Sequence, residues 1–127
     1  MNTGHDGSLT TIHSNTPKDA ISRLATLVIM AGTELPERAI KEQIVGAVDL
    51  IVQTNRFSDG SRKVTYITEI TTDDNNEIVL KDIFTYKQTG IKDGKVIGKM
   101  SPTGDIPTFY DEIFAHGMTI NKEIFNV

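Results

Sequence analysis

The sequence predicts a single α/β domain in which two helices separate an opening strand from an antiparallel sheet. Residues 8–13 are rich in Thr and Ile, as strands are. Apolar residues then recur at helical spacing up to about residue 46, and beyond it short apolar runs alternate with turn residues. The chain has 127 residues, a length that suits one domain.

The first predicted helix has a well-marked beginning and end. Thr16 is placed to cap it, Pro17 suits its first turn, and Asp19 completes a capping box with Thr16. Gly32 ends this helix, and Pro36 begins a second one. The apolar stripe of the first helix comprises Ala20, Ile21, Leu24, Leu27, Val28 and Ala31.

The second half of the chain predicts an antiparallel meander of about four strands. The predicted strands cover residues 47–53, 62–71, 78–88 and 95–100, and the first of them is an apolar run expected to be buried. Turn residues lie between successive strands, at 58–61, 73–76 and 93–94. A short helix over residues 107–116 follows, and Ile124 and Phe125 of the tail are expected to dock on the domain.

Composition excludes several classes of protein. The formal net charge is -4, which argues against general nucleic-acid binding through a basic surface. The absence of cysteine excludes a disulfide scaffold and thiolate zinc sites. The histidines lack the spacing of zinc ligands, so no metal site is predicted.

His5 and His13 are the first candidates for chemistry. They lie eight residues apart, and they share a face if the opening strand extends over both. Ser14 and Asn15 add polar groups at the end of that strand, where open α/β sheets bind ligands, and the capped helix that follows favours anions. This arrangement favours phosphate chemistry. A surface loop with two ordinary histidines accounts for the same residues equally well.

The opening run MNTGHDGSLTTIHSN, residues 1–15, resembles the histidine box of type II/IV secretion ATPases, specifically the CpaF-type ATPases of Tad/Flp pilus assembly. The resemblance extends over nearly the whole chain. Its further segments are residues 17–24, 47–53, 59–62, 67–69, 83–84, 88–90 and 103–104.

The resemblance implies that the chain is the C-terminal part of a RecA-like P-loop ATPase domain, ending in the antiparallel meander and a short helix. Residues 1–57 would form the histidine box and α/β tail, and residues 58–127 the meander and terminal helix. The family's phosphate loop and Walker B segment precede the box and are absent from this sequence. The isolated chain is therefore expected to be inactive and to need no cofactor by itself.

For the intact protein, the resemblance implies ATP hydrolysis with Mg²⁺ by a homo-hexamer. It would act at the cytoplasmic face of the inner membrane, as a peripheral protein, with a membrane platform protein and without nucleic acid. Hydrolysis would power pilus assembly or type II/IV secretion.

The resemblance also assigns expected roles to individual residues. His5 and His13 would lie near the γ-phosphate and be catalytic. Arg23, Arg56 and Arg62 would contact nucleotide or a neighbouring subunit, although an ordinary surface position accounts for each arginine as well. The alternative function is a non-enzymatic interaction domain that binds a neighbouring subunit or the platform protein.

Overall fold

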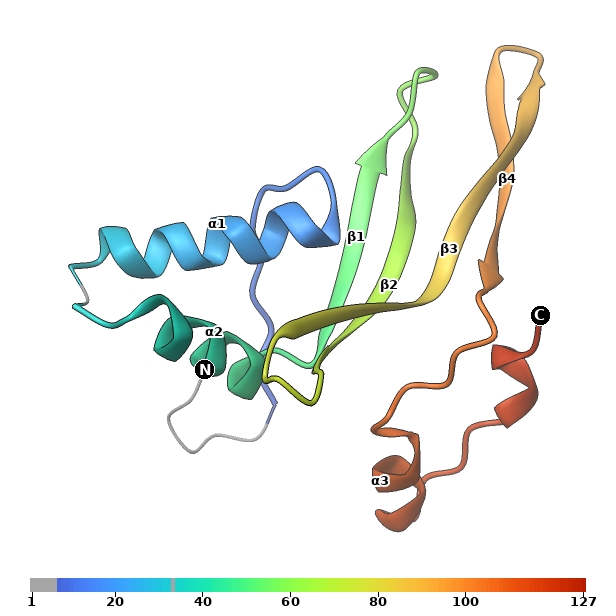
Figure 1. Cartoon of the computed structure of the whole chain (residues 1–127). Coiled ribbons are helices and arrows are strands. Elements are labelled where there is room, and N and C mark those ends of the chain that lie inside the picture. Colours follow the sequence, from blue (N-terminus) through green and yellow to red (C-terminus); the bar gives the residue numbers. More distant parts are fainter. Residues whose placement is uncertain (1–6, 33) are drawn as a thin grey trace.

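The structure is a computed structural model that describes residues 7–32 and 34–127 (Figure 1). Its helices are α1 (Pro17–Met30), α2 (Glu37–Ala47) and α3 (Tyr110–Ala115), and a short 3₁₀ turn, η1, covers Lys122–Phe125. Its strands are β1 (Leu50–Arg56), β2 (Arg62–Thr72), β3 (Ile78–Lys92) and β4 (Lys95–Pro102). The α/β class is confirmed.

The four strands form one antiparallel sheet in the order β1-β2-β3-β4. The predicted meander is confirmed, and so are its turns at residues 58–61, 73–76 and 93–94. The ends of β3 and β4 project from the rest of the domain as a long hairpin (Figure 1). This hairpin, residues 85–101, is called the β3–β4 arm below.

The prediction of an opening strand at residues 8–13 is wrong. The segment has no regular secondary structure, and Leu9 is fully exposed. A strand needs a neighbour to satisfy its backbone N–H and C=O groups, and no described strand pairs with this segment. A favourable residue composition therefore did not produce a strand here.

The prediction of a buried strand over residues 47–53 is corrected in two respects. The strand begins at Leu50, because α2 continues to Ala47. It is also an edge strand, so Leu50 is 39% and Val52 55% exposed, and Gln53 is its only buried side chain. An edge strand has a neighbour on one side only, which leaves this apolar run half covered.

The cap of α1 by Thr16 is confirmed, whereas the Asp19 carboxylate bonds one residue before the N-cap instead of to the N-cap itself. The Asp19 N–H donates to Thr16 Oγ1 at 3.1 Å, and the Asn15 N–H donates to Asp19 Oδ2 at 3.0 Å. The predicted apolar stripe is covered only in part, since Ala20 is buried but Leu27 is 54% exposed. The C-terminal half of α1 thus presents apolar side chains to solvent.

The core has one part between the helices and one on the sheet. Its buried apolar residues are Ala20, Ile40, Ile44, Ile70, Ile83, Val96 and Phe125. The Phe125 ring lies 5.9 Å from that of Phe84 and 6.0 Å from that of Tyr110, whereas Ile124 is half exposed. The tail therefore docks through Phe125, which confirms half of the expectation.

A buried carboxylate attaches the C-terminal segment to the sheet. Glu69 of β2 is only 2% exposed and accepts hydrogen bonds from the Thr108 N–H, at 3.0 and 3.1 Å, and from the Thr108 hydroxyl at 2.6 Å. Lys81 Nζ lies 3.4 Å from Glu69 Oε1 and donates to the Ile106 carbonyl at 3.0 Å. Residues 106–108 are held in this way, and α3 begins at Tyr110, later than predicted.

The tip of the β1–β2 hairpin is joined to the β3–β4 arm. Asp59 Oδ2 accepts the Val96 N–H at 2.8 Å, and the Phe57 and Tyr86 rings meet edge to face at 5.2 Å. The hydrogen bonds from the Ser61 hydroxyl, the Val96 N–H and the Ser61 N–H lower the pKa of Asp59 to about 2. The two hairpins therefore brace each other.

Candidate functional site

The polar loop before α1 is fastened to β1 by a reciprocal pair of hydrogen bonds. Ser14 Oγ donates to Gln53 Oε1 at 3.1 Å, and Gln53 Nε2 donates to the Ser14 carbonyl at 2.9 Å. Asn55 Nδ2 donates to the Asn15 carbonyl at 3.2 Å. Residues 14 and 15 are thus held against the carboxyl-terminal half of β1.

A second layer of hydrogen bonds supports Gln53 and Asn55 from β2. Thr65 Oγ1 donates to Asn55 Oδ1 and lies 3.4 Å from the Gln53 carbonyl. Gln53 Nε2 also donates to the Thr54 carbonyl at 3.1 Å. The buried amide is fully paired, so it can fix the loop without an unsatisfied polar group. Gln53, Asn55 and Thr65 were not predicted as site residues from the sequence. The glutamine at the end of an apolar run was a signal for the role of Gln53.

A cleft of about 810 Å³ lies between residues 7–14, the first turns of α1 and strand β1. Its wall is apolar at Leu24 and along β1, whereas His13 and Arg62 contribute polar or charged groups. The His13 side chain is exposed and belongs to the lining of this cleft. Such a cleft can hold a polypeptide segment along its apolar wall and an anion beside the imidazole and guanidinium groups.

The structure brings together some of the predicted site residues and separates others. His13 and Arg62 line the same cleft, and Arg56 lies directly opposite Arg62 in the β1–β2 register. Arg23 does not line this cleft; its Nε lies 3.3 Å from Asp19 Oδ2, within the capping box. His5 lies outside the described residues.

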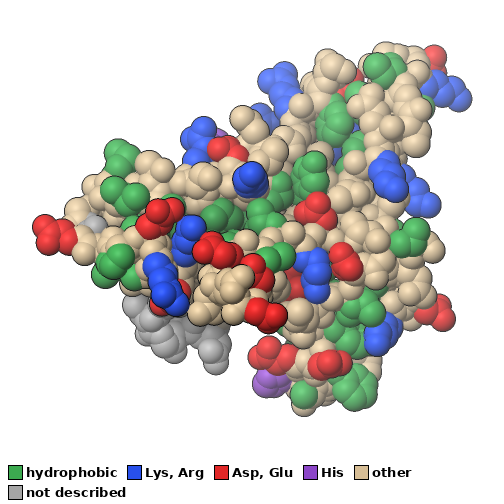
Figure 2. All heavy atoms as spheres, in the orientation of Figure 1, with side chains coloured by type: hydrophobic (Ala, Val, Ile, Leu, Met, Phe, Trp, Pro, Cys, Tyr) green, Lys and Arg blue, Asp and Glu red, His purple; other side chains and the backbone are tan. Residues whose placement is uncertain are grey.

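The described part of the chain, residues 7–32 and 34–127, contains no cluster of three or more potential metal ligands. It also contains no helix that is long and apolar enough to cross a membrane. On the face drawn in Figure 2, most acidic side chains lie in the lower half, where Lys and Arg side chains stand among them.

Several curated proteins are similar to about half of the chain. The conjugal transfer protein TrbB of Rhizobium radiobacter is 48% identical over 61 residues, which are 48% of this chain and 18% of TrbB. The type IV secretion system protein VirB11 of Bartonella quintana is 36% identical over 69 residues, 53% of this chain and 19% of VirB11. The chain therefore spans about a fifth of the length of the curated relatives it matches.

The sequence profile of the family described as "Type II/IV secretion system protein" matches residues 1–98. That match includes the polar loop, the cleft, both long helices and most of the sheet. The chain belongs to the type II/IV secretion system protein family.

Proposed function

We propose that this chain is the C-terminal part of a secretion motor ATPase, and that its cleft receives a β-strand from the nucleotide-binding part of the same protein. The observation that supports this proposal most directly is the cleft. It separates a strand-like but unpaired segment, residues 8–13, from the free edge of β1.

Chain connectivity supports a shared sheet for these two segments. A strand, a helical crossover and a second strand form a right-handed unit in which the two strands run parallel, and other strands can lie between them. Residues 8–13, the helices α1 and α2, and then β1 have this order. One strand inserted in the cleft would pair with both flanks and complete a RecA-like sheet.

Uncovered apolar side chains support the same arrangement. Leu50 and Val52 of β1 and Leu27, Ile29 and Met30 of α1 are exposed in this chain. Leu50 and Val52 line the cleft, so a strand placed there would cover them. We assign that contact to the upstream part of the motor.

The site residues take their roles from this arrangement. His13 directly precedes the fastened Ser14 and lines the same cleft as Arg62, so both would donate hydrogen bonds to a phosphate bound there. Phosphoryl transfer depends mainly on positioning and on stabilising negative charge, which these two groups supply. His5 remains a proposed partner of His13. Arg56 and Arg23 lie outside the cleft lining and are better placed for a neighbouring subunit.

For the intact protein, we extend the proposal to ATP and Mg²⁺ as cofactors and to a homo-hexamer at the inner membrane. Its partner would be a membrane platform protein. ATP hydrolysis would power pilus assembly of the Tad/Flp type or export. The support is the resemblance of residues 1–15 and the family membership. The chain alone would have no turnover.

The test compares histidine variants in the longer gene product that contains this chain. His13→Ala should lower ATP turnover by roughly 10²–10³ while nucleotide affinity changes little, because the lost hydrogen bond acts in the transition state. His116→Ala is the matched control, since His116 is exposed at the end of α3, and it should leave turnover unchanged.

The 127-residue chain by itself should bind ATP only at millimolar concentration or more weakly in calorimetry, because it has no phosphate loop. Micromolar binding by the isolated chain would contradict the proposal. Normal turnover of His13→Ala, or a large drop in its melting temperature, would remove His13 from the catalytic residues. A longer protein without any ATPase activity would favour the alternative of a non-enzymatic interaction domain.

A further inference from the structure

Charge is distributed unevenly along the chain. The β3–β4 arm contains four lysines and only one acidic residue, Asp93, so it carries a net charge of +3. Because the whole chain carries -4, the remainder carries -7. Figure 2 shows Lys and Arg side chains at the tip and along the outer edge of the arm, whereas acidic side chains gather lower on the molecule.

The four lysines of the arm form two pairs of like charges. The strand register places Lys87 directly opposite Lys99, and Lys92 directly opposite Lys95. Like charges opposite each other in an antiparallel pair destabilise the pairing. All four lysines are exposed, and none forms an ion pair with any residue in the described part of the chain. Within residues 7–32 and 34–127, their charge is therefore left unpaired.

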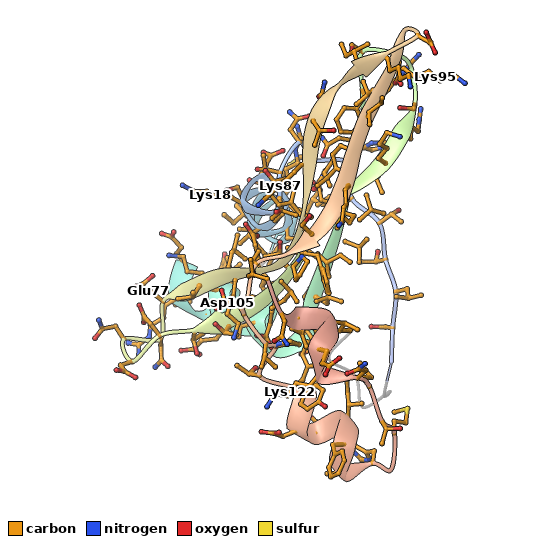
Figure 3. The ribbon with its side chains drawn as sticks, turned by 90° about the vertical axis from the view of Figure 1, so that its right-hand side faces the viewer. Lys18, Glu77, Lys87, Lys95, Asp105 and Lys122 are labelled. Atoms are coloured by element: carbon orange, nitrogen blue, oxygen red, sulfur yellow. The ribbon has the colours of Figure 1, made fainter. Side chains whose placement is uncertain are left out.

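An exposed apolar residue lies between the two pairs. Lys95, Ile97 and Lys99 alternate along β4, so they share one face of the arm. Ile97 is 41% exposed, and its cross-strand neighbour is Gly90, which has no side chain to cover it. At the usual rise per residue, the two lysine pairs lie about 13 Å apart along the strand. Figure 3 shows Lys95 at the tip of the arm and Lys87 farther down.

The opposite face of the arm is braced against the first hairpin. Tyr86 packs on Phe57 and over Gly98, and the Val96 N–H is bonded to Asp59. The lysine face is thus presented on a supported hairpin, so less conformational freedom is lost when it binds a partner.

We propose that the face formed by Lys87, Lys92, Lys95, Ile97 and Lys99 binds an extended acidic segment of a partner protein. That segment would carry carboxylates four residues apart, one for each lysine pair, and an apolar residue midway to contact Ile97. This pattern repeats the spacing of Lys95, Ile97 and Lys99 in an extended chain. The proposal does not depend on ATP hydrolysis by the intact protein.

Protection against aggregation can explain lysines on a free edge, and both strands of the arm have one, because β3 pairs with β2 only up to Thr85. It does not explain why like charges lie directly opposite each other, which destabilises the strand pairing. Nucleic-acid binding and lipid binding also fit the arm less well than an acidic segment does. The lysine face has no aromatic side chain on which nucleic-acid bases could stack. Asp93 occupies the tip, and Ile91 lies on the face opposite to Ile97, so a flat lipid surface could not cover both isoleucines.

The experiment measures binding of a fluorescent threonine-rich peptide, with two glutamates four residues apart and a valine midway, to the 127-residue chain by anisotropy. We expect binding that weakens with salt. Lys99→Gln should weaken it roughly threefold, and Lys87→Gln with Lys99→Gln roughly tenfold, since each surface ion pair contributes modestly. The controls, Lys18→Gln alone and with Lys122→Gln, remove the same charge elsewhere and should leave binding unchanged.

Two further probes separate the proposal from nonspecific attraction. A peptide with glutamines in place of the glutamates, and one with the valine changed to threonine, should both bind more weakly. The proposal would be overturned if all three peptides bound equally well, or if Lys18→Gln weakened binding as much as Lys99→Gln does. Tighter lysine-dependent binding of a DNA duplex or of phosphatidylglycerol vesicles would overturn the choice of a protein partner. Unchanged melting curves establish that the variants are folded.

Discussion

The two halves of the molecule differ in how far their own contacts pair their backbone and hold their segments together. In the first half, residues 8–13 pair with no described strand, and apolar side chains of α1 and β1 face solvent. In the second half, Glu69 fastens the C-terminal segment, Asp59 joins the two hairpins, and Phe125 closes the core. The second half therefore completes its own sheet and fastens its C-terminal segment, although the lysine face of the β3–β4 arm and apolar side chains such as Phe114 stay exposed. The first half instead contains a segment of strand composition that has no described strand to pair with.

The difference reflects how far apart in the sequence the contacting segments of each half lie. The sheet is built from hairpins, so each strand finds its neighbour a short distance along the chain. A parallel strand at residues 8–13 needs a neighbour from another part of the chain. Contacts that are local in sequence form without outside help, and the following predictions test how independent the second half is.

The largest expected effect follows from removing the buried carboxylate. Glu69→Ala should lower the free energy of unfolding by about 2–3 kcal/mol, because it removes the hydrogen bonds that the charged Glu69 carboxylate accepts from Thr108 and its ion pair with Lys81. Chemical denaturation monitored by circular dichroism measures this value. Glu112→Ala, at an exposed position on α3, is the control and should change stability by less than about 0.5 kcal/mol. Equal effects of the two changes would show that the C-terminal segment does not depend on Glu69.

Local signals in the sequence predicted much of this fold. Thr16, Pro17 and Asp19 marked the start of α1, and turn residues marked every hairpin, because capping and turn geometry depend on adjacent residues. Alternating apolar residues placed β2 to within one residue, and β3 begins where predicted but continues four residues beyond Gln88, to Lys92. These features need no knowledge of the rest of the structure.

The site was less predictable, because its contacts join residues far apart in the sequence. Ser14 and Gln53 are 39 residues apart, as are Glu69 and Thr108. Residues 8–13 have the composition of a strand but lack a neighbour, which composition cannot reveal. His13 and Arg62 were identified individually, and only the structure shows that they share a cleft.

A smaller effect is expected from adding one methyl group to the arm. A Cβ at Gly98 would lie 2.5 Å from the Lys87 carbonyl oxygen and would also clash with the Tyr86 ring. Gly98→Ala should therefore cost about 2 kcal/mol of stability through backbone displacement. Gly90→Ala is the matched control, since nothing lies within 4 Å of an added Cβ there. Thermal melts of the two variants measure the difference, and an equally stable Gly98→Ala would mean that the arm is not tightly braced.

The loop of the first half gives a third prediction. Gln53→Ala removes the paired amide that holds Ser14 and should cost about 1–2 kcal/mol, the usual effect of losing buried hydrogen bonds. Amide exchange should speed up at residues 14 and 15 and not in the β3–β4 arm. Gln88→Ala, at an exposed position in that arm, is the control. Faster exchange throughout the sheet would show that the two halves are more strongly coupled than their contacts suggest.

The smallest expected effect is the response of the hairpin contact to acid. Hydrogen bonds from Ser61 and Val96 favour the charged carboxylate of Asp59 and lower its pKa from 3.8 to about 2. A carboxyl whose pKa is lower in the folded state stabilises that state fully above the unfolded value and loses this contribution as pH falls through the folded one. The contribution of Asp59 should thus be complete above about pH 4 and decline toward about pH 2. The chemical shift of the Val96 amide should follow that titration, whereas in Asp59→Asn it should stay constant over the same range. A Val96 shift with a midpoint near pH 4 would mean that Asp59 has an ordinary pKa, and that the first hairpin does not hold the arm in solution.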